Sequence, residues 1–192
     1  MQSIYLIRHA RTNANRTGRL CGKSESELLD SEDVIMNEIS NKIEKFTNPV
    51  VISSPSMRAQ ITAKTLGYEV MTNEGLHEFD FGDFEGMTFK EIEDNHPEEF
   101  HQICENGINY KYPNGEGLEV FINRVSLAYE DIIKAYGDKD EIVIVSHGGV
   151  MQALISYILT KSDALYWNFK IKNCMVVKIY YCEEFPVIEY MK

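Results

Sequence analysis

The sequence predicts an α/β fold, a three-layer sandwich in which a mostly parallel central sheet lies between helices. Short, β-rich apolar segments alternate with longer segments whose apolar residues have helical spacing, which is typical of parallel sheets. The chain has 192 residues, of which 44% are hydrophobic and 26% charged, enough for one globular unit with a sizeable core. We therefore expect residues 1–192 to form a single domain.

The expected strands are short apolar runs bounded by turn residues, at 3–7, 50–53, 68–71, 141–146, 174–181 and 186–190. The expected helices have apolar residues three or four positions apart, at 31–46, 55–66, 88–95, 97–106, 118–136 and 150–159. Pro55 suits a first helical turn and marks one helix start. The polar residues 10–22 predict a loop.

Residues 74–119, called the cap segment below, are acidic and aromatic. The chain has 30 acidic and 19 basic residues, and the cap segment contains thirteen of the former and two of the latter. We interpret this stretch as an insertion of loops and helices over the C-terminal ends of the strands. Residues 1–23, in contrast, contain five basic residues and no acidic one. An anionic ligand is therefore expected to bind locally, beside the acidic cap segment.

Composition excludes several classes of partner. A net charge of −11 and a pI near 4.9 disfavour nucleic acids and anionic membrane surfaces. No apolar run reaches membrane-spanning length, and the amino terminus is charged too early for a signal peptide. The four cysteines form no CxxC pair, which argues against a disulfide framework or a structural zinc site. We expect a cytoplasmic protein, and the sequence predicts no oligomeric state.

Polar residues follow three of the expected strands: Arg8 and His9, then Arg58, then His147 with Gly148. Ligands of open α/β sheets bind outside the carboxyl ends of the strands, so these side chains are expected to share one pocket. Each of them, taken singly, is more often structural than functional. Their coincidence at three strand ends favours a site.

The residue types in this pocket point to phosphoryl transfer. Arginine forks and glycine N–H groups at a helix start bind phosphate oxygens. A neutral imidazole is a nucleophile, and a second histidine can stabilise the developing charge. No metal or organic cofactor is expected. A metallohydrolase using His9, His147 and Glu78 is physically possible, but the adjacent arginines would repel a cation.

Four segments resemble, in order and spacing, the signatures of the histidine phosphatase superfamily (phosphoglycerate mutase-like). LIRHARTNANRTG resembles L-x-R-H-G-E-T-x-x-N, and SSPSMRAQITA resembles S-S-x-x-x-R-A-x-x-T-A. LHEFDFGDFEGMTFKEI resembles L-x-E-x-x-F-G-x-x-E-G, and VSHGGV resembles V-x-H-G-G. The resemblance covers nearly the whole chain.

The resemblance implies roles for individual residues. His9 corresponds to the phosphorylated nucleophile and Glu78 to the proton donor. The implied phosphate pocket consists of Arg8, Asn15, Arg58, His147 and Gly148. Gly22 occupies a glycine position of the family's substrate loop, although the residues after it depart from the usual pattern.

One departure changes charge near the pocket. The family's Gly-Glu after Arg-His is Ala10-Arg11 in this chain. Ala10 requires ordinary backbone angles where glycine would allow a positive φ. We expect Arg11 to attract a second anionic group of the substrate.

We therefore expect a phosphomonoesterase that hydrolyses a small phosphorylated metabolite through a phosphohistidine. The chain looks most similar to α-ribazole-5′-phosphate phosphatases and small broad-specificity phosphatases. A phosphoglycerate mutase is the alternative within the enzymes. A non-catalytic phosphate-binding module is the alternative outside them, although a binder needs neither a nucleophile nor a proton donor.

Overall fold

In the computed structural model, six strands form one sheet in the order β3-β2-β4-β1-β5-β6. The structure describes residues 2–30, 39, 46–183 and 185–191. The strands are β1 (Ser3–Arg8), β2 (Val50–Ser53), β3 (Val70–Thr72), β4 (Glu141–Ser146), β5 (Val176–Cys182) and β6 (Phe185–Met191). The helices are α1 (Asn13–Thr17), α3 (Met57–Lys64), α4 (Phe89–Asn95), α5 (Pro97–Asn106), α6 (Leu118–Tyr136) and α7 (Gly148–Thr160).

The sheet is mixed, with a parallel part that carries the site. β1 pairs in parallel with β4, and β2 in parallel with both β4 and β3. β5 and β6 form an antiparallel hairpin at the β1 edge. The register places Arg8 opposite Ser146 and Ser53 opposite Val145. Three strands therefore end at nearly the same level, as the predicted α/β fold requires.

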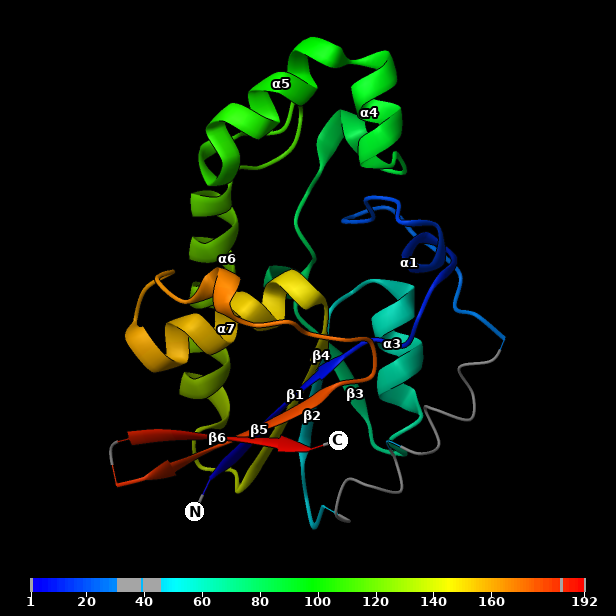
Figure 1. Cartoon of the computed structure of the whole chain (residues 1–192). Helices are drawn as coiled ribbons and strands as arrows, with labels where there is room; N and C mark the ends of the chain where they lie inside the picture. The colour runs from blue at the N-terminus through cyan, green and yellow to red at the C-terminus, as the bar shows by residue number, and fades with distance from the viewer. Residues whose placement is uncertain (1, 31–38, 40–45, 184, 192) are drawn as a thin grey trace.

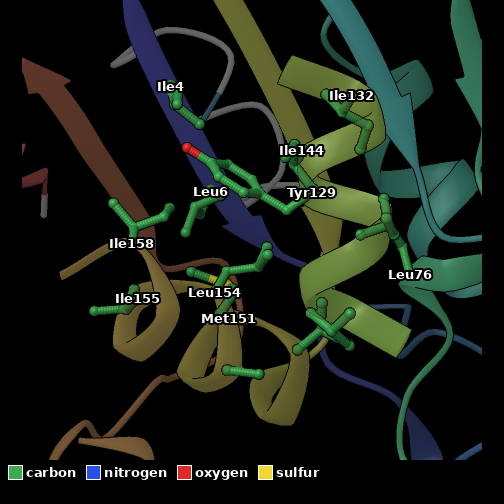
Figure 2. Packing of buried hydrophobic residues seen from close by; sticks show 14 of the residues in the cluster. Ile4, Leu6, Leu76, Tyr129, Ile132, Ile144, Met151, Leu154, Ile155 and Ile158 are labelled. Carbon is green, nitrogen blue, oxygen red and sulfur yellow. The ribbon is translucent and has the colours of Figure 1, made fainter. Parts of the chain in front are cut away.

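Helices cover both faces of the sheet, with α6 and α7 on one face and α3 on the other (Figure 1). Residues of β1 alternate between two hydrophobic clusters. Ile4 and Leu6 pack with Leu154 of α7 and its neighbours (Figure 2), whereas Tyr5 and Ile7 pack with Ala63 of α3. This period of two is that of a strand buried on both faces. The predicted three layers are confirmed.

The cap segment contains α4 and α5, which lie beyond the end of the sheet at which β1 and β4 terminate (Figure 1). Thr88 and Glu91 form a capping box that begins α4, and Pro97 stands in the first turn of α5. A separate cluster of Phe84, Ile92, Tyr110 and Tyr112 stabilises this part. The cap segment thus has apolar packing of its own.

Some predicted boundaries were wrong. The residues expected to form a loop contain the short helix α1, because Thr12 and Asn15 form a capping box. α3 begins at Met57 instead of Pro55, because Ser56 is still extended. The helix predicted over 31–46 lies outside the described residues, apart from the buried Ile39 and Phe46. In the described part of the chain, no helix is long and apolar enough to cross a membrane.

Candidate active site

The register of β1 and β4 brings the two histidines together. The His9 N–H donates to the Ser146 carbonyl at 2.8 Å, which aligns the residues that follow each strand. The ring centroids of His9 and His147 are 5.1 Å apart, and both residues are buried. The expectation that these strand ends converge is confirmed by this geometry.

His9 is held as a neutral imidazole. Its Nδ1 lies 2.6 Å from the Ala10 carbonyl oxygen, which can only accept, so Nδ1 carries the proton and Nε2 keeps a lone pair. Burial, together with the positive charges of Arg58 and Arg8, lowers the pKa of His9 to about 3. The free Nε2 is the atom of a nucleophilic histidine that attacks phosphorus.

His147 offers one engaged and one unengaged nitrogen. Its Nε2 is 2.7 Å from the Ser54 hydroxyl, whereas Nδ1 is buried without a partner among the described residues. Burial, with repulsion from His9 and Arg58, keeps the pKa of His147 well below 6.5. A buried polar atom without a partner is costly, so Nδ1 would gain from a hydrogen bond to a ligand that reaches it. If a ligand oxygen lay beside His147, the Nδ1–H would donate a hydrogen bond to it, while Nε2 would accept one from the Ser54 hydroxyl.

Arg8 presents a second unengaged donor. Its Nη1 donates to the Ile171 carbonyl at 2.7 Å, while Nε is buried without a partner among the described residues. A Cβ on Gly148 would lie 3.2 Å from the Arg8 Cζ, so glycine leaves this guanidinium room at the start of α7. Arg8 and His147 thus each keep one buried donor without a partner among the described residues, and the two side chains are close enough to interact electrostatically.

Arg58 is 2% exposed and is fixed by the loop that follows α1. Its Nη1 donates to the Ser24 carbonyl at 2.8 Å and its Nη2 to the Gly22 carbonyl at 2.6 Å. A Cβ on Gly22 would lie 1.8 Å from the Phe79 carbonyl oxygen, so only glycine fits there. The N–H of Gly22 donates to the Glu85 carboxylate. Gly22 therefore contacts the site through its carbonyl, which accepts from Arg58.

Glu78 lies at the border between the cap segment and α7. Its Oε2 accepts from the Gly149 N–H at 3.0 Å, and its Oε1 from the Phe79 N–H at 3.0 Å. Electrostatic interaction with Arg8 places the carboxylate beside the arginine pocket. Arg124 donates to the carbonyls of Gly75 and His77 and fixes the segment before Glu78.

Asn15 and Arg11 line a cavity of about 530 Å³ on the other side of Arg8, together with Lys170, Ile171, Lys172 and Asn173. The Asn15 Oδ1 accepts from the Asn173 Nδ2 at 3.0 Å, so the Asn15 amide presents Nδ2 as a donor. Arg11 is exposed. Ala10 is buried, has no positive φ and donates its N–H to Thr62, so ordinary angles suffice there, as expected.

Sequence reasoning missed several supporting residues: Ser54, Glu85, Arg124, Gly149 and Asn173. Ser54 and Gly149 stand inside two of the quoted motifs, next to residues that were singled out. Glu85 also lies in a motif, but nothing in the sequence distinguishes it from neighbouring carboxylates. Arg124 and Asn173 are brought close only by the tertiary fold. Within the described ranges, no group of three or more His, Cys, Asp and Glu side chains is placed to hold a metal ion.

The site therefore combines a neutral imidazole, unsatisfied donors and an adjacent carboxylate. Two arginines and the first N–H groups of α7 favour a dianion at this place. Burial, together with the positive charges of Arg58 and Arg8, lowers the pKa of His9 and of His147 and so keeps both imidazoles neutral. The arrangement can bind a phosphate monoester, attack it from His9 and protonate a leaving oxygen from Glu78.

Comparisons with known proteins agree with this chemistry. The sequence profile of the Histidine phosphatase superfamily (branch 1) matches residues 4–192. Phosphoserine phosphatase 1 of Hydrogenobacter thermophilus is 27% identical over 192 residues, covering 98% of this chain and 90% of the relative. The mouse 6-phosphofructo-2-kinase/fructose-2,6-bisphosphatase 1 is 30% identical over 162 residues, or 84% of this chain. This chain spans only 34% of that bifunctional protein.

The fold is shared with solved structures. The α-ribazole phosphatase from Shigella flexneri superposes with a TM-score of 0.90 at 25% sequence identity. The match covers 99% of this chain and 96% of the other. The mixed six-stranded sheet and its helical layers are therefore those of a known architecture.

Proposed function

Because the chain belongs to the histidine phosphatase superfamily, we propose that it hydrolyses small phosphate monoesters through a phosphohistidine formed on His9. The observation that carries the proposal is the buried pair of unengaged donors, Arg8 Nε and His147 Nδ1, beside the free Nε2 of His9. A phosphate group satisfies both donors and presents phosphorus to the imidazole. Together these groups support a phosphatase.

In the first half of the proposed reaction, the ester phosphate lies between Arg8, Arg58 and His147. His9 Nε2 attacks phosphorus as the bond to the ester oxygen breaks, and Glu78 donates a proton to that oxygen. The arginines and the imidazole stabilise the charge on the three equatorial oxygens. Phosphohistidine and free alcohol are the products of this half.

In the second half, water takes the place of the alcohol. Glu78, now a carboxylate, accepts a proton from the water as its oxygen attacks phosphorus and the bond to Nε2 breaks. Inorganic phosphate leaves and neutral His9 is restored. The hydrogen bond from Nδ1 to the Ala10 carbonyl keeps the ring in one orientation through both halves.

The remaining expected residues receive supporting roles in this proposal. Asn15 Nδ2 and the Gly148 N–H supply further donors to the phosphate. The Gly22 carbonyl accepts a hydrogen bond from the Arg58 guanidinium, so Gly22 acts on the phosphate through Arg58. Arg11 attracts a second anionic group into the cavity that it lines with Lys170 and Lys172. The cap segment, residues 74–119, brings the proton donor over the strand ends.

The test measures phosphate release from a panel of monoesters and traps the covalent intermediate. We expect wild-type protein mixed with ³²P-labelled substrate to carry an acid-labile, base-stable label, as a phosphohistidine does. His9→Ala should lose both label and turnover, whereas His101→Ala, an exposed histidine of α5, should keep both. Transfer within phosphoglycerates without phosphate release would instead support a mutase. Binding of phosphate without a label or turnover would identify a binding module.

A further inference from the structure

A second cavity, of about 320 Å³, lies on the Glu78 side of the site. It opens between the cap segment and the residues at and after α7. Seven aromatic side chains line it: Phe79, Phe81, Phe89, Tyr110, Tyr112, Tyr166 and Trp167. It shares no lining residue with the basic cavity of Arg11. The two cavities are therefore distinct and differ in charge.

The aromatic lining is preformed. Tyr166 and Trp167 meet edge to face with centroids 4.8 Å apart, and Tyr110 and Tyr112 do so at 5.0 Å. Tyr112 also contacts Phe81 at 5.3 Å. These contacts fix the rings in place, so a flat apolar group entering the cavity would lose little freedom in its surroundings.

Charge in this cavity is confined to one group. Glu78 contributes the carboxylate, and no lysine, arginine or histidine stands among the described residues that line the walls. An additional phosphate or carboxylate would meet no cation among these residues and would lose its hydration against apolar walls. An uncharged group is therefore favoured in the aromatic cavity.

Two large aromatic side chains of the cavity wall remain in contact with solvent. Trp167 is 65% exposed and Phe89 is 48% exposed, while Phe84, Tyr110 and Tyr112 of the cap segment are buried. Exposed apolar surface at the mouth of a pocket is typical of a ligand-binding site. A ligand ring that covered these side chains would remove their apolar surface from water.

We infer that the aromatic cavity binds the alcohol part of the substrate and selects monoesters that carry an aromatic or bulky apolar group. The inference rests on the proposed function, because Glu78 protonates the leaving oxygen and also lines this cavity. The ester oxygen must therefore lie at Glu78, and the remainder of the alcohol must extend past it into the aromatic walls. Trp167 and Phe89 are the specificity-determining residues at the mouth.

The decisive experiment compares phenethyl phosphate with ethyl phosphate. Both are esters of primary alcohols with similar leaving-group basicity, so the chemical step is matched and the ring is the main difference. We expect kcat/KM to be at least about tenfold higher for phenethyl phosphate, as burial of a ring allows. O-phosphoserine, with a charged side chain, should be used less well than phenethyl phosphate.

Substitutions in the cavity wall test whether the preference for phenethyl phosphate arises there. Trp167→Ala and Phe89→Ala should each lower the phenethyl-to-ethyl ratio of kcat/KM at least about threefold. Both residues are partly exposed, so the variants are expected to fold, which thermal unfolding will check. Phe185→Ala is the matched control, because Phe185 is 72% exposed but lies in β6, outside the cavity. Its ratio should equal that of the wild type.

Binding can be followed without turnover, because Trp167 is the chain's one tryptophan. In the His9→Ala variant, phenethyl phosphate should change the tryptophan fluorescence at lower concentration than ethyl phosphate does. A ratio near one for the two esters, or a ratio insensitive to both substitutions, overturns the inference even if p-nitrophenyl phosphate is hydrolysed and His9 is labelled. Failure of the proposed function is a separate result: no monoester, p-nitrophenyl phosphate included, is hydrolysed.

Discussion

Arg58 Nη2 donates to the Gly22 carbonyl at 2.6 Å, so the proposed phosphate pocket depends on a loop that contacts the cap segment. Glu85 of the cap segment holds that loop. Its carboxylate accepts from the N–H groups of Gly22, Lys23 and Ser24 and from the Ser24 hydroxyl. Glu85 is therefore a positioning residue that acts on Arg58 through the loop.

Glu85→Gln tests this connection. A carboxamide places an NH₂ group where backbone donors now meet an oxygen, which disturbs the loop and with it the acceptors of Arg58. We expect kcat/KM for p-nitrophenyl phosphate to fall about tenfold, about 1.4 kcal/mol, mainly through KM because the phosphate contact weakens. Glu91→Gln, which changes a cap-segment carboxylate paired with Arg19, is the control. Equal kinetics of wild type and Glu85→Gln would contradict the positioning role.

Gly149→Ala should misplace the proposed proton donor. A Cβ there would lie 2.5 Å from the Glu78 Oε1, so the carboxylate must move. We expect kcat to fall more for ethyl phosphate than for p-nitrophenyl phosphate, because a poor leaving group depends more on protonation. Gly117→Ala is the matched control, since the nearest atom to its Cβ would be 3.7 Å away. A uniform loss on both esters would argue against Glu78 as the acid.

His9 should not titrate near neutral pH in the free protein. Burial and the charges of Arg58 and Arg8 lower its pKa from 6.5 to about 3, so the ring stays neutral on acidification to pH 5. In an NMR titration, the His9 ring resonances should therefore stay constant from pH 8 to pH 5, with added free histidine as the reference. Arg58→Met should raise the pKa by removing a positive charge. A midpoint between pH 6 and 7 for wild-type His9 would contradict this prediction.

The same depressed pKa makes stability depend on pH. Between about pH 6.5 and pH 3 the unfolded state binds a proton on His9 that the folded state does not, so the free energy of unfolding falls as pH falls. The loss is about 1.4 kcal/mol per pH unit for this histidine. Urea unfolding at pH 6.5 and pH 5 should show a smaller difference for His9→Gln than for wild type. His101→Gln, at an exposed position, should keep the wild-type difference.

Arg11→Glu tests the basic cavity beside Asn15. Reversing this charge among Lys170 and Lys172 should raise KM several-fold for esters with a second anionic group, such as 3-phosphoglycerate. The KM for p-nitrophenyl phosphate should change little, because that ester has one charged group. Arg16→Glu, an equally basic and exposed position on α1, is the control. An equal rise for both esters would sink the proposed role of Arg11.

The spacing of apolar residues along the chain was sufficient to predict many of the helices and strands. The range predicted as helix 118–136 and the strand 141–146 coincide with α6 and β4, because their apolar periods are long or uninterrupted. Boundaries failed where a cap decides, as at Ser56 before α3 and Thr12 before α1. The Thr12 side chain accepts from the Asn15 N–H and begins α1, whereas the Ser56 side chain makes no cap hydrogen bond and the extended backbone of Ser56 delays the start of α3. Apolar periodicity records neither feature.

The sequence by itself determined which polar residues follow buried strands, and hence that His9, Arg58 and His147 meet at one edge of the sheet. The positions of the strands along the chain follow from local apolar runs, and parallel strands bring their carboxyl ends to one edge. Only the tertiary structure decided how those side chains are oriented. The tautomer of His9, the loop that holds Arg58 and the aromatic walls beside Glu78 depend on contacts between residues distant in the chain, which no local pattern encodes.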